Sequence, residues 1–289
     1  MDIQRMKTRI FLAVVMCMIL LVSLSSATFA WFTANRQVET SRVESRTATE
    51  DVSLLISTKG GSDFEGGHVA DIEQVNDTKM TYLLPVSTAD LEHFVTCSVT
   101  TPEGYAENFV KMEKEDKYFH GRIYMMAKVS GTNESSTVSI YLDESKDAGG
   151  ALVQREDEDS LILNAARLGL KFNEDAATSV IFRLSEEKNK GDDRKDNTKV
   201  DGKVLDDGYV LDSSGKDIEA VKDPAVLIED YTIDDSSGRL PEKPLFTLQA
   251  GKIYPIDIYY YLEGCDADCT EAISFDGNDL HLAFYGVLS

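Results

Sequence analysis

The sequence predicts an all-β protein, specifically a jelly-roll-like antiparallel β-sandwich with one or two short helices and a long acidic surface insertion. Three observations favour this class. Apolar and polar residues alternate with a period of two in many short segments, turns rich in Gly, Asn, Asp and Ser separate these segments, and no amphipathic helices alternate with them. About eight or nine such strands, each burying one face, are typical of a sandwich or jelly roll.

The strands can be placed along the chain by this alternation. The clearest segments are 121–131, 136–143, 179–185, 253–264 and 278–288, and further strands are expected at 52–57, 80–87, 167–173 and 244–250. In the first of these, Ile123, Met125, Ala127 and Val129 share one face. The residues NESST at 133–137 predict a hairpin turn between the two clearest strands.

Two short helices and one insertion complete the expected domain. Asp159 or Ser160 is a candidate N-cap for a helix over 159–168, and Ser87 is a candidate N-cap for a second helix over 87–94. Residues 185–223 are polar and rich in Gly, Asp and Lys, which indicates a surface excursion. Apolar residues at 204–211 predict one small hairpin within it.

The first thirty residues have the pattern of an export signal. Basic residues precede an apolar stretch, Ile10–Leu24, and a run of small residues follows at 25–30. Cleavage is expected after Ala30, which divides the chain into a signal at 1–30, an N-terminal arm at 31–50 and a single domain at 51–289. The product would be secreted or held at the cell surface. The alternative is an uncleaved helix over 10–32, long enough to tether the domain to a membrane.

The strong negative charge limits the classes of partner. The chain carries 51 acidic and 29 basic residues, a formal net charge of −22, so binding to nucleic acid is not expected. Membrane contact is expected only through the signal, unless the signal stays uncleaved. Surface carboxylates of this number usually form a solvated face, although they could hold Ca²⁺ loosely. No other cofactor and no metal site is predicted.

Three cysteines remain after the signal, namely Cys97, Cys265 and Cys269. Cys265 and Cys269 are separated by three residues, so a small disulfide-closed loop is sterically feasible and is the candidate that we favour. Two reduced thiols are the alternative, and a zinc site would want more Cys or His nearby.

The sequence contains no recognisable catalytic motif. The four histidines, at positions 68, 93, 120 and 281, form no HExxH pair, and the nucleophile elbow, the phosphate-binding loop and the dinucleotide fingerprint are all missing. We therefore expect a non-enzymatic protein with no catalytic residues.

The signal boundary resembles that of a known group of exported proteins. An apolar signal that ends in Thr28, Phe29 and Ala30 and is followed by Trp31, Phe32 and Thr33 is similar to camelysin and TasA of Gram-positive bacteria, which are processed by a signal peptidase of the SipW type. The resemblance implies a subunit of, or an accessory to, an extracellular biofilm matrix fibre. Its expected partners are copies of itself or a related matrix subunit, and the signal peptidase during export.

The resemblance also implies that the N-terminal arm of one subunit completes the sheet of the next. Trp31 and Phe32 would then be aromatic anchors, and Val38 and Val43 the apolar residues of the donated strand. A spacing of five residues places these two valines on opposite faces of a regular strand. The alternative functional hypothesis is a monomeric, membrane-tethered surface domain that binds a ligand.

Overall fold

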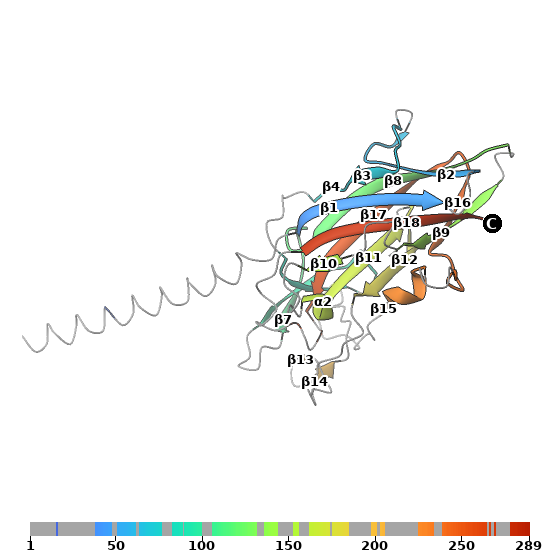
Figure 1. Ribbon diagram of the computed structural model, residues 1–289. Coiled ribbons are helices and arrows are strands. Elements are labelled where there is room, and N and C mark those ends of the chain that lie inside the picture. Colours follow the sequence, from blue (N-terminus) through green and yellow to red (C-terminus); the bar gives the residue numbers. More distant parts are fainter. Residues whose placement is uncertain are drawn as a thin grey trace, which may run out of the picture.

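The protein is a two-layer β-sandwich, which confirms the predicted all-β class. The computed structural model describes residues 16, 38–47, 51–61, 64–76, 83–88, 90–99, 106–131, 136–143, 153–155, 162–173, 175–184, 198–200, 203–205, 225–233, 239–264, 266, 269 and 278–289. In Figure 1, β1 (Val38–Thr47) and β18 (Asn278–Leu288) run side by side across the front of the molecule, and strands of the second sheet pass behind them. The jelly-roll order of connections stays a prediction.

The first sheet joins strands from the two ends of the described chain. Its order is β16-β9-β18-β1-β3, and β10 also pairs with β18. The remaining bounds are Val69–Asp71 for β3, Thr137–Leu142 for β9, Val153–Arg155 for β10 and Phe246–Gln249 for β16.

The second sheet is larger and is organised around β17 (Ile253–Glu263), which pairs with β11, β8 and β5. From β11 the sheet continues to β12 and β15, from β5 to β6 and β7, and from β8 to β2 and β4. The bounds are Val52–Ser57 for β2, Glu73–Gln74 for β4, Pro85–Ser87 for β5, Val95–Val99 for β6, Ala106–Lys111 for β7, Phe119–Val129 for β8, Ala166–Phe172 for β11, Asp175–Arg183 for β12 and Val226–Leu227 for β15.

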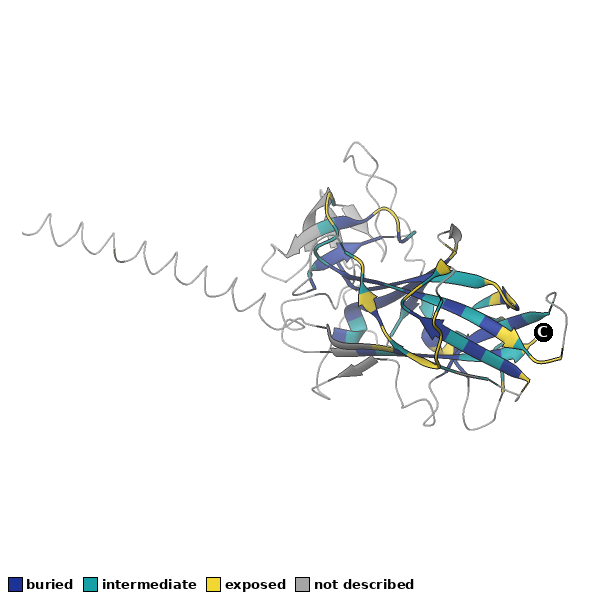
Figure 2. Ribbon diagram, turned by 90° about the horizontal axis from the view of Figure 1, so that it is seen from above, coloured by how far each residue is buried: buried dark blue, intermediate teal, exposed yellow. Residues whose placement is uncertain are grey.

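The main core lies between the two sheets and contains the apolar faces that the alternation predicts. Figure 2 shows buried positions following the strands through the interior. Fully buried side chains come from β8, β9, β17 and β18, among them Ile123, Met125, Ile140, Ile258, Leu282 and Phe284. Because adjacent side chains of a strand point to opposite faces, the period of two brings these residues into one layer.

Several local predictions were wrong. The segment 133–137 does not join a hairpin, because β8 and β9 belong to different sheets and the connection crosses between them. The sandwich is also not purely antiparallel, since β1 with β18, β12 with β15 and β17 with β5 pair in parallel. Of the helix expected over 159–168, residues 159–161 lie outside the described residues, and in the described part the helix α2 (Ile162–Ala165) ends early, because β11 begins at the next residue and pairs with strands on both sides.

The second expected helix, over 87–94, is a bend. Ser87 belongs to β5, and the Thr88 hydroxyl accepts hydrogen bonds from the backbone N–H groups of Asp90 and Leu91. Leu91 has a φ of 58°, in the left-handed region, which a right-handed helix cannot accommodate. A second helical segment, the 3-10 helix η3 at Ile228–Tyr231, had no sequence signal.

Within the acidic insertion the structure describes one hairpin. Its strands are β13 (Thr198–Val200) and β14 (Lys203–Leu205), which pair antiparallel. The hairpin therefore overlaps the segment predicted for it, 204–211, at residues 204 and 205. Residues 206–211 lie outside the described residues.

Replacing Gly251 with alanine is expected to destabilise the fold by about 1–2 kcal/mol. Gly251 turns the chain between β16 and β17 with a φ of 78°, and its N–H donates to Ala127 O at 2.8 Å. An added Cβ would meet no atom within 4 Å, so the loss would come from backbone strain alone. Chemical denaturation measures it, with Lys252→Ala as the control for an exposed neighbour. A loss equal to that of the control would contradict the assignment.

Candidate functional site

Most of the predicted cleavage and assembly residues lie outside the part of the chain that the structure describes. This holds for Thr28, Phe29, Ala30, Trp31 and Phe32, so their roles stay predictions. Val38 is the first residue of β1, and Val43, near its middle, is completely buried in the main core.

The structure places the second half of the predicted arm inside the domain. β1 lies between β18, with which it pairs in parallel from Val38 to Thr47, and β3, with which it pairs antiparallel at 42–44. The boundary expected at residue 51 therefore needs correcting, because residues 38–47 are an interior strand of their own sheet. The physical reason is that β18 presents an edge whose backbone groups β1 satisfies.

A register shift explains how a polar segment fits this position. Val38 pairs with Asn278 and Val43 with Leu282, so five residues of β1 span four residues of β18. The shift lies between Val38 and Ser41, where one strand has an extra residue, as at a β-bulge. The expectation that the two valines lie on opposite faces assumed a regular strand, and the register shift interrupts that regularity between them.

Polar side chains of β1 also bind the edge of the second sheet. Ser45 Oγ donates to Leu54 O at 2.7 Å, and Thr47 Oγ1 donates to Val52 O at 2.8 Å. His68 Nδ1 lies 3.1 Å from the same Leu54 oxygen, so it donates there. The small hydroxyl residues of β1 therefore satisfy backbone acceptors of β2, where the first sheet meets the second.

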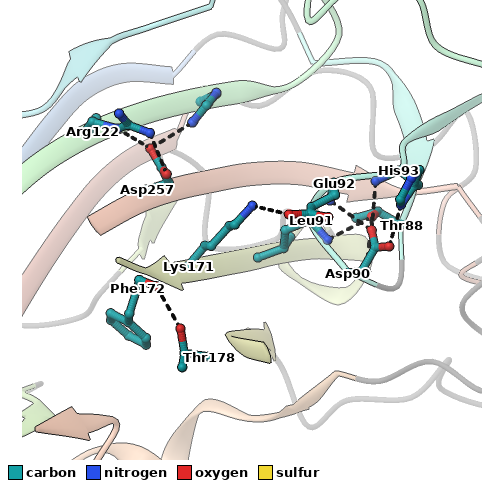
Figure 3. Close-up of polar contacts among 11 residues, drawn as sticks. Thr88, Asp90, Leu91, Glu92, His93, Arg122, Lys171, Phe172, Thr178 and Asp257 are labelled. Carbon is teal, nitrogen blue, oxygen red and sulfur yellow. Dashed lines mark hydrogen bonds and ion pairs between the residues drawn. The ribbon is translucent and has the colours of Figure 1, made fainter. Parts of the chain in front are cut away.

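A second candidate site covers the outer face of the second sheet. Cross-strand register places Lys171 of β11 beside Asp257 of β17, and Asp257 beside Arg122 of β8. Arg122 donates two hydrogen bonds to Asp257, from Nε to Oδ1 at 2.6 Å and from Nη2 to Oδ2 at 2.9 Å. Figure 3 shows this pair and, further along the sheet, Lys171 reaching Glu92 at 2.7 Å.

His120 connects Asp257 to the segment that precedes β8. Its Nε2 lies 3.2 Å from Asp257 Oδ1, and its Nδ1 lies 2.9 Å from Glu115 Oε2. The ring stacks on Tyr259, with centroids 4.3 Å apart and planes inclined by 15°. The imidazole thus sits between two carboxylates and over an aromatic face, with only 11% of its side chain exposed.

Residues 90–94 and 112–118, which lie before β6 and after β7, cover this outer face, and we call them the cover segment. Leu91 lies over Gly169, where an added Cβ would come within 2.5 Å of the Leu91 side chain. Phe94 stacks on Tyr118 at 4.0 Å and contacts Tyr259 and Tyr261. The covered face is a second, smaller core, which explains why β17 is buried on both faces.

Opposing effects set the protonation of the charged groups under the cover. Burial alone would lower the pKa of His120, but its hydrogen bonds with Asp257 and Glu115 and their negative charges raise it overall. Burial would raise the pKa of Asp257, but hydrogen bonds and positive charge from His120 and Arg122 lower it overall. The hydrogen bond with His120 is the main reason that the pKa of Glu115 is lowered.

The tight loop after β17 contains the disulfide candidates. Cys269 is buried, and its N–H donates to Asp266 O at 2.9 Å. The fully buried Arg167 of β11 holds the same loop, because its Nη2 donates to Asp266 Oδ2 at 2.5 Å. Cys265 lies outside the described residues, so the bond between Cys265 and Cys269 stays a prediction.

The described side chains form no arrangement typical of a metalloenzyme. No group of three or more His, Cys, Asp or Glu in this part of the chain is placed to hold a metal ion. Within the same residues, no helix has the length and apolar character needed to cross a membrane. Loose Ca²⁺ binding by surface carboxylates stays a prediction.

Comparison with known proteins returned no match among family models, curated proteins or solved structures. Sequence reasoning missed His120, Glu115, Arg122, Asp257 and Lys171. One signal could have found this site. In the segment 253–264, Asp257, Tyr259 and Tyr261 share the face of the strand that lies opposite the predicted core face. Two tyrosines on that face indicate that other residues cover it.

Proposed function

We propose that this chain is a secreted or cell-surface structural protein without enzymatic activity, which assembles into extracellular matrix fibres through its N-terminal strand. The observation that supports the proposal is the position of β1. It is the first strand of the described chain, yet it lies in the interior of its sheet between β18 and β3. A strand near the N-terminus that fills an interior position is suited to exchange between copies.

Exchange would preserve the contacts that the structure shows within one copy. If β1 leaves its position, the edge of β18 opens, and β1 of a second copy can restore the same parallel pairing. Each copy then donates one strand and accepts another, which is a heterologous contact that need not close. Repetition of this contact gives a filament of copies, or one that includes a related subunit.

The residues before β1 would strengthen such an assembly. Trp31 and Phe32 begin the mature chain if the signal is cleaved after Ala30, and they can fill an apolar groove on the neighbour. Burial of two aromatic side chains contributes on the order of 3–6 kcal/mol before ordering costs. Mass spectrometry of the native N-terminus tests the cleavage, and a chain that retains residues 1–30 would instead favour the membrane-tethered monomer.

A switchable disulfide tests strand exchange directly. Arg42 of β1 pairs with His281 of β18, and neighbouring strands bring Cα atoms within the range that a disulfide spans. We expect the double variant Arg42→Cys/His281→Cys, in the chain starting at Trp31, to form filaments when reduced. After oxidation of the monomer, β1 is locked to its own β18, and we expect at least a tenfold loss of filament mass by negative-stain microscopy and sedimentation.

Matched controls separate assembly from exchange. The single variant Arg42→Cys should form filaments under both conditions, and peptide mapping should confirm the new bond in the double variant. Filaments from the oxidised double variant would contradict exchange of β1 but not assembly. Monodisperse monomers from the unmodified chain, at all concentrations tested, would contradict the fibre function.

A further inference from the structure

His120 connects the cover segment to the second sheet through its side chain. It lies at the second position of β8, and its two ring nitrogens contact carboxylates from different elements. Glu115 belongs to the cover segment and Asp257 belongs to β17 in the sheet beneath it. The ring is therefore the polar link between the cover segment and the second sheet at this point.

The geometry requires a proton on each ring nitrogen. An ionised carboxylate only accepts hydrogen bonds, and a neutral imidazole has one N–H donor and one lone pair. With contacts of 2.9 Å to Glu115 and 3.2 Å to Asp257, a neutral ring would turn its lone pair toward one of the two carboxylates. Only the imidazolium donates to both, so the observed arrangement belongs to the protonated form.

The groups that face this ring support the same conclusion. From β17 come the Asp257 carboxylate and the face of the Tyr259 ring, and from the cover segment comes the Glu115 carboxylate, which also has a hydrogen bond with Tyr118. Arg122 of β8 is already bound to Asp257 through two hydrogen bonds, and register places it beside Glu73 of β4. Lys171 of β11 is beside Asp257 in register, but its ammonium donates to Glu92 of the cover segment.

We propose that His120 is a proton-operated clasp that tightens the cover segment onto the second sheet when the imidazole is charged and loosens it when the imidazole is neutral. This inference is independent of the proposed fibre function. On deprotonation, one carboxylate loses its hydrogen bond from the ring and faces a lone pair instead. Glu115 then keeps its hydrogen bond with Tyr118, and Asp257 keeps its two hydrogen bonds from Arg122. Glu115 is the one that can move, because 45% of its side chain is exposed, whereas Asp257 is buried and held by Arg122.

The backbone beside the clasp limits how far it opens. The Asn76 amide donates to Glu115 O at 2.8 Å and to Tyr118 O at 3.1 Å, and Asn76 Oδ1 accepts from His120 N at 2.9 Å. These bonds do not depend on the charge of the ring. Deprotonation therefore loosens the segment around Glu115 without detaching the cover segment from the sheet.

The sign of the pH dependence follows from this arrangement. The pKa of His120 is raised in the folded protein above its ordinary value of 6.5, so the folded state binds the proton more tightly than the unfolded state. The added stability is fully present below pH 6.5 and is lost as the pH rises through the higher folded value. The pKa values of Glu115 and Asp257 are lowered in the folded protein. The stability that these two carboxylates contribute is therefore lost only when the pH falls into the acid range.

Two measurements on the full chain test the clasp. In ring-¹⁵N NMR, assigned by comparison with His120→Gln, we expect both nitrogens of His120 to be protonated at pH 6.5, with a titration midpoint above that value. In thermal unfolding between pH 6 and pH 9, we expect the midpoint temperature of the wild type to fall by about 2–4 °C more than that of His120→Gln.

Two variants serve as matched controls. His93→Gln removes an exposed histidine that pairs with Asp90 at 2.7 Å, and it should keep the full wild-type fall. Glu115→Gln should lose most of the fall, because its amide can donate to the lone pair of a neutral ring. A titration midpoint of His120 at or below 6.5, or an equal fall in wild type and His120→Gln, would overturn the proposal. If His120→Gln does not fold, Glu115→Gln decides, because its fall in midpoint temperature is compared with wild type directly, and a fall equal to that of wild type would overturn the proposal.

Discussion

Asp257→Ala is expected to destabilise the protein by about 3–5 kcal/mol, because it removes the buried carboxylate that binds both Arg122 and His120. Only 4% of the Asp257 side chain is exposed, and its two oxygens accept from Arg122 Nε, Arg122 Nη2 and His120. Without this carboxylate, a guanidinium and an imidazolium face each other under the cover segment. Urea denaturation at pH 6 measures the loss.

Glu92→Ala is the matched control for Asp257→Ala. It also removes a carboxylate that accepts from a cation on this face, Lys171, but 42% of the Glu92 side chain is exposed. Water can replace it, so we expect a loss of about 0–1 kcal/mol. Equal losses of unfolding free energy in the two variants would show that burial does not determine how much these ion pairs stabilise the protein.

Val43→Asp is expected to destabilise the protein by an amount on the order of 3–5 kcal/mol, because it places an unpaired carboxylate in the main core beneath β1. Val43 is completely buried, and it pairs in register with Leu282 of β18 and Ala70 of β3. We expect β1 to be displaced first, so amide exchange should rise at the β18 groups that face it. Denaturation and hydrogen exchange together measure the change.

Arg42→Asp introduces the same carboxylate one residue earlier, on the exposed side of the same strand. The charge there stays hydrated, and we expect a loss within about 1 kcal/mol. A large loss at Arg42 combined with a small loss at Val43 would mean that β1 lies with the opposite face inward.

The period-two pattern predicted the strands well where one face meets the main core. Ile123, Ile140, Ile258 and Leu282 all lie between the sheets, as their spacing indicates. The alternation by itself did not predict that β17 is covered on its other face as well, because Asp257 in that register is typical of a solvent-facing residue; Tyr259 and Tyr261 are the one indication of a cover. The burial of Asp257 depends on Arg122 and His120, which are distant in sequence and are brought beside it by strand pairing.

Local sequence patterns also could not predict the order of the strands in the sheets. NESST has the composition of a hairpin turn, but β8 and β9 find their partners in different sheets. The polar segment at 38–47 did not look like a strand of this domain, since its backbone pairing with β18 and the hydroxyl groups of Ser45 and Thr47, rather than a continuous apolar face, hold it in place. Such contacts depend on tertiary context, which overrides local propensity.

The parallel pairing of β1 with β18 has a consequence for the order of folding. The two strands stand at opposite ends of the described chain, so the first sheet cannot be completed until almost the whole polypeptide has been delivered. Contacts that close so long a loop form late and slowly. We expect a chain emerging during synthesis or translocation to keep β1 unpaired for most of that time, when it is open to capture by a chaperone or by a finished neighbour.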